Sequence, residues 1–245
     1  MNLVLDIGNT RTKGGLFDGK TLVEHFYFDK NPLGQIKQLL AGHPEIKFSL
    51  VSSVLNHSKE LTNSLRSRTN CIEFNADTRL PIKIAYKSPE TLGKDRIAAA
   101  IGAYTLFKGH PTLSVDAGTC IKFDFVTAEG EYLGGSIAPG VEMRLKALNT
   151  FTDKLPLVSV NAAYTALIGT STGESILSGV QNGALYEVKG FMEAYKKQYP
   201  GLKTVISGGD APFFENALKN SIFADPNLVL TGLNEILNFN VSRLA

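Results

Sequence analysis

The alternation of apolar and polar residues predicts three strands at the start of the chain. Leu3–Leu5 is a short apolar run that ends at an Asp-Ile-Gly turn, and residues 12–17 and 21–28 have the composition of strands. Asp18-Gly19-Lys20 separates the last two, and Asp-Gly is a strong signal for a tight hairpin. The chain is therefore predicted to open with an antiparallel meander.

Helical and strand-like segments follow this meander. Apolar residues at helical spacing favour helices, whereas short apolar runs between turn residues favour strands. Helices are expected at residues 32–41, 58–68, 89–107, 176–195, 212–219 and 233–243. Strands are expected at residues 47–51, 71–74, 113–119, 121–126, 131–135 and 203–206. This mixture indicates an α/β fold.

The opening pattern recurs after about half of the chain. Leu113–Thr119 repeats Leu3–Asn9 at a shift of 110 residues, with Leu, Asp and Gly identical. In both places a second strand, a polar turn and a third strand follow. We interpret this as a duplication. Residues 1–111 and 112–245 would be two half-domains that pack face to face, with a cleft between them.

Charge and composition narrow the choice of partners. The chain has 245 residues, and its 25 Lys+Arg against 23 Asp+Glu give a net charge of +2, which provides no general attraction to nucleic acid or anionic membranes. Any phosphate must therefore be bound locally. No apolar run approaches the ~20 residues of a membrane span, and the start of the chain lacks the features of a signal peptide.

Cysteines and histidines argue against two kinds of structural site. Cys71 and Cys120 lie in strand-like runs without CxxC spacing, so buried free thiols are expected, which suggests a cytoplasmic protein. The four histidines form no HxxxH or HxH pair, so a histidine-based zinc site is not expected. They are His25, His43, His57 and His110.

A formal phosphate-loop match occurs at Gly14–Thr21, which fits G-x-x-x-x-G-K-[ST]. That motif binds phosphate only where a glycine loop opens a helix. Here Leu16-Phe17 look like strand core, and residues 22–28 are strand-like. A hairpin with a coincidental match is the better interpretation.

The two Asp-x-Gly turns, at Asp6 and Asp116, are more informative. Backbone N–H groups of a tight turn bind phosphate oxygens, and the adjacent carboxylate can hold a cation or its water shell. A single copy would be an ordinary turn. Two copies at equivalent places predict that both turns clamp one triphosphate.

Other candidate residues lie near helix starts. In Gly93-Lys94-Asp95-Arg96, an arginine could bind a carboxylate or phosphate while the Asp accepts a hydroxyl proton, although a solvated surface pair is an equal alternative. Gly134–Gly140 is expected to be a flexible turn that enters a helix at Val141. Gly169–Gly173 and Ser207–Pro212 are turns that could simply cap helices. The glycine pair of the last is a candidate for adenine contact.

Together these motifs resemble the type III pantothenate kinase family, of the acetate and sugar kinase/Hsp70/actin superfamily. The resemblance runs from Asp6 to the Ser207–Asp210 turn. Its elements, in the family's order, are Asp6–Thr10 with Lys13, Gly93–Arg96, Asp116–Thr119 and Gly134–Gly140. It implies a duplicated ribonuclease H-like (actin-like ATPase) fold with a central cleft. The implied reaction is ATP-dependent phosphorylation of the primary hydroxyl of pantothenate to 4'-phosphopantothenate, the first step of coenzyme A biosynthesis.

The resemblance also implies roles for individual residues. The first ATP loop would consist of Asp6, Ile7, Gly8, Asn9, Thr10, Arg11, Thr12 and Lys13, with Asp6 acting through the water shell of Mg²⁺. Thr119 would contact ATP from the second loop, and Asp116 would bind a monovalent cation, potassium or ammonium. Asp95 would be the general base. The residues that bind pantothenate would be Tyr86, Gly93, Lys94, Asp95, Arg96 and Thr172.

Thr172 would act across the interface of a homodimer, although Thr170 in the same loop is an alternative. Cys120 departs from the family, whose members often carry alanine there. The main rival function is another small-molecule kinase of the superfamily, such as a sugar kinase. A non-catalytic accessory factor for gene expression would be favoured by loss of Asp95 or Arg96, but both are present. An assembly ATPase would need larger insertions than this length allows.

Overall fold

A computed structural model describes residues 1–8, 12–29, 32–53, 59–218 and 221–242. The chain falls into two compact units. Unit 1 consists of Met1–Gly109, Gly130–Leu133 and Asn227–Ala245, and unit 2 consists of His110–Glu129 and Gly134–Pro226. The first crossing lies close to the expected boundary at residues 111 and 112. The last helix, however, groups with unit 1 rather than with the second half of the chain.

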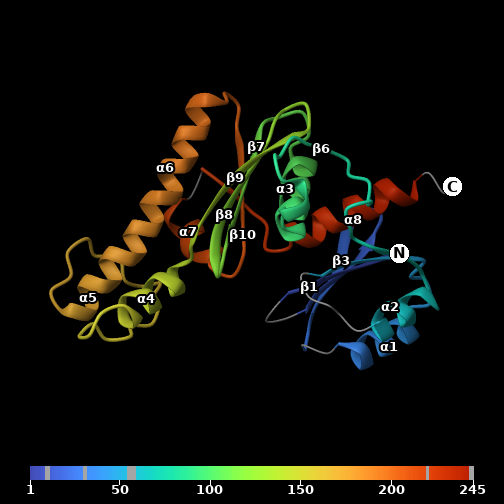
Figure 1. The fold of residues 1–245 in the computed structure, drawn as a ribbon, viewed down its shortest axis with the longest axis horizontal. Coiled ribbons are helices and arrows are strands. Elements are labelled where there is room, and N and C mark those ends of the chain that lie inside the picture. The colour runs from blue at the N-terminus through green and yellow to red at the C-terminus, as the bar shows by residue number, and fades with distance from the viewer. Residues whose placement is uncertain (9–11, 30–31, 54–58, 219–220, 243–245) are drawn as a thin grey trace. The chain divides into compact units, whose positions relative to one another are not determined.

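Unit 1 contains a five-stranded sheet in the order β3-β2-β1-β4-β5 (Figure 1). Its strands are β1 (Asn2–Ile7), β2 (Thr12–Asp18), β3 (Thr21–Phe28), β4 (Phe48–Ser53) and β5 (Asn70–Glu73). The first three form the predicted antiparallel meander, and β4 and β5 run parallel to β1. Gly19 turns the hairpin with φ of 59°, so the segment that matches a phosphate loop is a hairpin, as expected.

Helices cover both faces of this sheet. The helical segments of unit 1 are α1 (Leu33–Gly42), α2 (Lys59–Arg66), the 3₁₀ turn η1 (Pro89–Thr91), α3 (Lys94–Leu106) and α8 (Leu228–Val241). Apolar residues of α1 and α2 pack against Leu3, Leu5 and Ile7 on one face. On the other face Asn2 of β1 hydrogen-bonds to Asn234 of α8, and α3 packs against α8. The helix expected at 89–107 starts only at Lys94, because Leu92 has an extended backbone.

The second sheet repeats the same order of strands. It runs β11-β10-β7-β8-β9-β6, with β7 antiparallel to β8 and parallel to β10. Its strands are β6 (Lys83–Ile84), β7 (Thr112–Ala117), β8 (Cys120–Val126), β9 (Glu131–Pro139), β10 (Lys203–Ser207) and β11 (Phe223–Ala224). Strand β6 pairs with the first residues of β9, which belong to unit 1. The order β9-β8-β7-β10-β11 matches β3-β2-β1-β4-β5, which supports the duplication.

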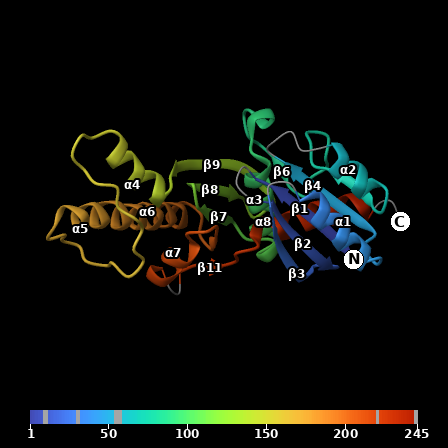
Figure 2. The same ribbon diagram turned by 90° about the horizontal axis from the view of Figure 1, so that it is seen from below.

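Unit 2 packs its helices around one apolar core. They are α4 (Val141–Thr150), α5 (Thr172–Leu177), the π-helical turn η2 (Ser178–Asn182), α6 (Gly183–Gln198) and α7 (Ala211–Ala217). The long α6 runs beside the sheet (Figure 2). Helix α4 packs against η2. Val180, Val188 and Phe214 join the buried residues of β7 and β8. The expected flexible turn Gly134–Gly140 is wrong, because pairing within the sheet extends β9 to Pro139.

The two cysteines are free, as predicted, but they are half-buried rather than buried. Cys71 lies in the edge strand β5, and Cys120 follows the turn between β7 and β8. Burial raises the pKa of the Cys71 thiol, which makes it less reactive at neutral pH.

Candidate active site

Polar side chains gather at the carboxyl end of β1 in unit 1. Asp6 pairs in register with Lys13 of β2 on one side and with Ser52 of β4 on the other. Opposed residues of neighbouring strands share a face of the sheet, so these three form one polar row. Ser52 is buried, and its hydroxyl has no hydrogen-bond partner among the described residues. Buried polar groups are normally paired, so this hydroxyl suits a polar ligand at the strand end.

The predicted first ATP loop is described only at its two ends. Asp6–Gly8 close β1, and Thr12–Lys13 open β2. Asn9, Thr10 and Arg11 lie outside the described residues. The antiparallel strands β1 and β2 on either side of them agree with the sequence-based expectation.

Helix α3 presents the predicted Gly-Lys-Asp-Arg motif in its first turn. Lys94 Nζ donates a hydrogen bond of 3.3 Å to the backbone oxygen of Ser53, at the end of β4. Asp95 is half-buried in this turn, where the positive end of the helix dipole favours a carboxylate. Arg96 is buried, and its Cζ lies 6.0 Å from the ring centre of Tyr86. The fold thus places Tyr86, which the family resemblance implies as a pantothenate ligand, beside the motif.

In unit 2 the turn after β7 is held by two contacts. Asp116 Oδ2 accepts an ion pair of 2.7 Å from Lys122 Nζ of β8. The N–H of Gly140 donates to the backbone oxygen of Thr119 at 3.0 Å. A β-carbon at position 140 would lie only 1.9 Å from the oxygen of Gly118, so no larger residue fits there. Thr119 itself is exposed, which leaves it accessible to a ligand.

The Ser207–Asp210 turn packs against the same loop. Gly208 has φ of 96°, and a β-carbon there would lie 2.1 Å from the oxygen of Ala117 and 2.7 Å from Asp116 Oδ1. The N–H of Asp210 donates to Ala117 O at 2.9 Å. Burial, with a smaller effect of the nearby Glu142 carboxylate, raises the pKa of Asp210. Two segments, Gly140 at the start of α4 and the Ser207–Asp210 turn, therefore pack against the second Asp-x-Gly loop.

The loop with the two candidate threonines is a capped helix start. Ser171 is the N-cap of α5, and its hydroxyl accepts from the N–H of Glu174. The Glu174 carboxylate accepts from the N–H and the hydroxyl of Thr170, at 2.8 and 2.5 Å. The hydrogen bond from the Thr170 hydroxyl is the main reason why the pKa of Glu174 is lowered. Thr172 is exposed, and its hydroxyl bonds to no other described residue.

In the described part of the chain, no group of three or more His, Cys, Asp or Glu side chains could hold a metal ion. No helix there is both long and apolar enough to cross a membrane.

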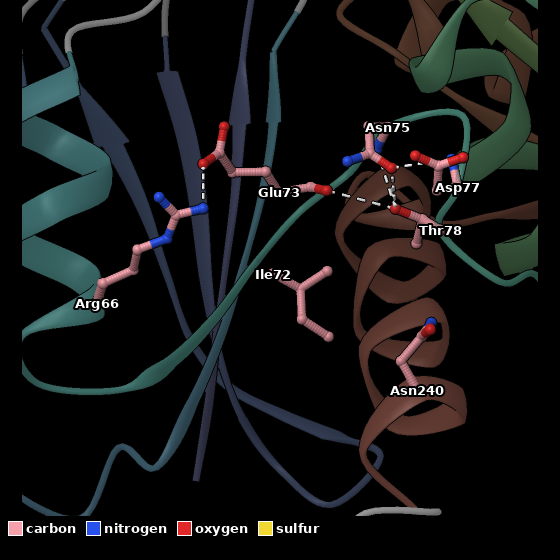
Figure 3. A pocket seen from close by; sticks show the side chains of 7 residues that line it. All are labelled: Arg66, Ile72, Glu73, Asn75, Asp77, Thr78 and Asn240. Carbon is pink, nitrogen blue, oxygen red and sulfur yellow. Dashed lines mark hydrogen bonds and ion pairs between the residues drawn. The ribbon is translucent and has the colours of Figure 1, made fainter.

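A polar pocket of about 380 Å³ opens beside β5 in unit 1 (Figure 3). Its lining residues are Arg66, Ile72, Glu73, Asn75, Asp77, Thr78 and Asn240. Arg66 and Glu73 form an ion pair of 2.7 Å, and Asn75 Oδ1 accepts from the N–H of Asp77. Because these groups bond to one another and no predicted site residue is among them, the pocket contributes nothing to the candidate site.

Comparison with known proteins identifies the family. Residues 2–194 match the family model described as type III pantothenate kinase. The chain belongs to the type III pantothenate kinase family. The type III pantothenate kinase of Phocaeicola vulgatus is 43% identical over 241 residues, which cover 98% of this chain and 99% of the relative.

Solved structures agree with this kinase family at the level of the fold. A conserved Campylobacter jejuni protein assigned to a Baf family of transcriptional activators has a TM-score of 0.63 and 23% identity, covering 98% of this chain and 99% of that protein. A ROK hexokinase from Thermus thermophilus has a TM-score of 0.53 and 16% identity, with coverage of 98% and 99%. The duplicated ribonuclease H-like fold expected from the sequence is confirmed.

Some residues beside the candidate site residues were missed by sequence reasoning. Ser52 and Lys122 were not singled out, and neither was the approach of Gly140 to the second loop. Lys122 had a usable signal, because a tight turn at Gly118-Thr119 places it opposite Asp116. Ser52 had none, since its proximity to Asp6 depends on the register between β1 and β4.

Proposed function

We propose that this kinase transfers the γ-phosphoryl group of ATP to the primary hydroxyl of pantothenate, giving 4'-phosphopantothenate in the first step of coenzyme A biosynthesis. The observation that carries the proposal is the family match over residues 2–194, which includes both Asp-x-Gly loops and the Gly93–Arg96 motif. The substrate is a small molecule, and neither nucleic acid nor a membrane takes part. Free thiols support a cytoplasmic location.

ATP is proposed to bind through the two loops. In unit 1 the loop from Asp6 to Lys13 supplies backbone N–H groups and the Lys13 ammonium group to phosphate oxygens. In unit 2 the exposed Thr119 contacts ATP. Mg²⁺ bound with ATP supplies the charge neutralisation that phosphoryl transfer requires. Asp6 is proposed to hold a water molecule of the Mg²⁺ hydration shell.

Asp95 is the proposed general base. It accepts the proton of the pantothenate hydroxyl as the new P–O bond forms, a contribution of typically ~10²–10⁴-fold in rate. Arg96 binds the substrate carboxylate, and Tyr86, Gly93 and Lys94 complete the pocket. The support is local: Tyr86 lies against the Arg96 guanidinium, and the Lys94 bond to Ser53 fixes the first turn of α3.

A homodimer is proposed to complete the pantothenate pocket, with Thr172 of the partner subunit contacting substrate. Thr170 is the weaker candidate because Glu174 already engages its hydroxyl. Phe151, Leu167 and Ile168 of unit 2 are 84%, 68% and 78% exposed. Apolar exposure of this extent is typical of interaction surfaces.

The dimer proposal has a direct test in solution. Phe151 also lines a cavity of about 540 Å³ beside α4 and η2. Phe151→Asp should give a monomer by light scattering and lose pantothenate affinity. Val23→Asp is the matched control, an exposed apolar position on β3 in unit 1, and should change neither. A monomeric wild type with full activity would refute the shared pocket.

The monovalent cation expected at Asp116 fits the observed side chains poorly. One oxygen of this carboxylate is paired with Lys122, and the other lies against the Gly208 turn. The expected ion and the observed ammonium group therefore compete for one carboxylate. If a monovalent cation binds Asp116, activity should depend on potassium. If the Lys122 ammonium group occupies this carboxylate instead, activity should not depend on potassium.

The proposed activity is tested by coupled ADP release with ATP, Mg²⁺ and pantothenate, and by mass spectrometry of the product. Asp95→Asn should lower kcat by at least about 10²-fold with little change in KM for ATP. Phosphorylation of a hexose but not of pantothenate would overturn the substrate and favour a sugar kinase. Full activity of Asp95→Asn would remove that residue from its role.

A further inference from the structure

Lys122 and Asp116 form a cross-strand ion pair at the second Asp-x-Gly loop. The two residues are directly opposed in the register of β7 and β8, and Lys122 Nζ lies 2.7 Å from Asp116 Oδ2. Their side chains are only 19% and 21% exposed. At this distance and burial the ammonium group neutralises the carboxylate with a fixed positive charge.

A second cation at this carboxylate would meet a positive charge that is already bound to it, because Lys122 Nζ contacts Asp116 Oδ2. A potassium ion on the same carboxylate would sit a few ångströms from the Lys122 ammonium group, and like charges at that range repel strongly in a partly buried site. It would also have to displace an existing charge-assisted bond.

We propose that the ε-ammonium group of Lys122 takes the place of the monovalent cation at Asp116, so that this kinase does not depend on potassium or ammonium ions. The inference rests on the proposed function. Lys122 is a positioning residue: it holds Asp116 and the Gly118-Thr119 turn in the phosphate-binding arrangement and adds a permanent positive charge beside it. The chain thereby carries covalently the charge that a bound ion would otherwise supply.

The first half of the chain places a lysine at the equivalent position. Lys13 of β2 is directly opposed to Asp6 of β1, as Lys122 of β8 is to Asp116 of β7. In both halves the register therefore sets a lysine opposite the aspartate, and in the second half the two side chains form an ion pair. A lysine opposite the aspartate thus occurs at equivalent places in both halves of a duplicated fold. This is expected if the lysine charge has a function, whereas an incidental lysine would have no reason to occur in both halves.

The test compares cation dependence in the full-length protein. Wild type is measured with choline chloride as the only added salt, and again with potassium chloride at equal ionic strength. Equal rates are expected. Lys122→Met should lose about 10²-fold in kcat/KM without potassium, the typical cost of one preorganised charge, and should regain activity with potassium or ammonium chloride. Lys122→Arg should stay independent of potassium.

Lys83→Met is the matched control. Lys83 forms the same kind of cross-strand pair with Glu131, at 2.6 Å, but on an exposed edge of unit 1. The Lys83→Met variant should therefore have the same rate as wild type and the same response to potassium.

A second readout needs no pantothenate. The melting temperature with a non-hydrolysable ATP analogue should be the same in choline and potassium for wild type, but should rise with potassium for Lys122→Met. A wild type that requires potassium overturns the proposal, even if Lys122→Met does not fold. So does a folded Lys122→Met that potassium fails to rescue. If pantothenate is not phosphorylated at all, the proposed function fails, whereas the melting experiment still decides the role of Lys122.

Discussion

Replacing Gly140 by alanine should disable the second loop without removing any functional group. A β-carbon at this position would lie 1.9 Å from the oxygen of Gly118 and 2.7 Å from that of Thr119, whereas real contacts of this kind stay beyond 3.0 Å. The loop or the start of α4 must therefore shift by at least about 1 Å, a displacement large enough to matter for catalysis. The bond between the Gly140 N–H and Thr119 joins the two segments, so neither moves alone.

The expected size of the effect follows from this shift. Misplacing a positioning group by about 1 Å costs about 10²-fold in rate, so kcat/KM for ATP should fall by about that factor. Overpacking costs about 1–3 kcal/mol, and each kcal/mol lowers the melting temperature of a protein of this size by about 2–4 °C. The kcat/KM for ATP and the melting temperature are measured on the same preparation, by coupled ADP release and by thermal melting.

Gly190→Ala is the control for the Gly140 substitution. Gly190 lies inside α6, where a β-carbon would meet nothing within 4 Å. Alanine is the better helix former by about 1 kcal/mol, so activity should not change and the melting temperature should stay equal or rise. An unchanged melting temperature for Gly140→Ala would refute the close approach. A lower melting temperature with unchanged kcat/KM would show that this loop does not act on ATP.

Three further predictions concern the substrate pocket and the helix cap. Arg96→Lys should raise KM for pantothenate much more than KM for ATP, since lysine keeps the charge but loses the planar fork that binds a carboxylate through two hydrogen bonds. Equal effects on the two KM values in steady-state kinetics would contradict this role. Thr172→Val should raise KM for pantothenate. Thr170→Val should lower only the melting temperature, because the Thr170 hydroxyl bonds to Glu174. The reverse result would mean that Thr170 binds the substrate and that Thr172 does not. The fold lowers the pKa of Glu174 below its usual value of 4.5. The ionised carboxylate therefore stabilises the protein at any pH above 4.5, and this stabilisation is lost as the pH falls through the lowered pKa. Glu174→Gln should therefore melt below wild type at pH 7, with the difference vanishing in acid, and a difference independent of pH would contradict the assignment.

Local patterns predicted much of what the structure contains. The hairpin at Gly14–Thr21 was recognisable because strand-like residues follow the lysine, where a phosphate loop requires a helix. The repeated strand–turn–strand pattern at Asp6 and Asp116 predicted the duplication, since each copy is a contiguous segment with its own turn. The turn predicted at Gly134–Gly140 was wrong. Glycine and proline usually mark turns, but here pairing with the neighbouring strand β8 continues β9 as far as Pro139.

The sequence by itself determined the order of most strands and turns, the two Asp-x-Gly motifs and the presence of a helix at the Gly93–Arg96 motif, although not the residue at which this helix starts. These depend on residues close together in the chain, whose spacing and turn chemistry are readable in one pass. The tertiary structure alone decided that Ser52 stands beside Asp6, that Gly140 supports the second loop and that α8 belongs to unit 1. It also decided that Lys122 neutralises Asp116. Each of these relations joins segments through sheet register or close packing, and hydrophobic periodicity carries no information about which distant segments meet.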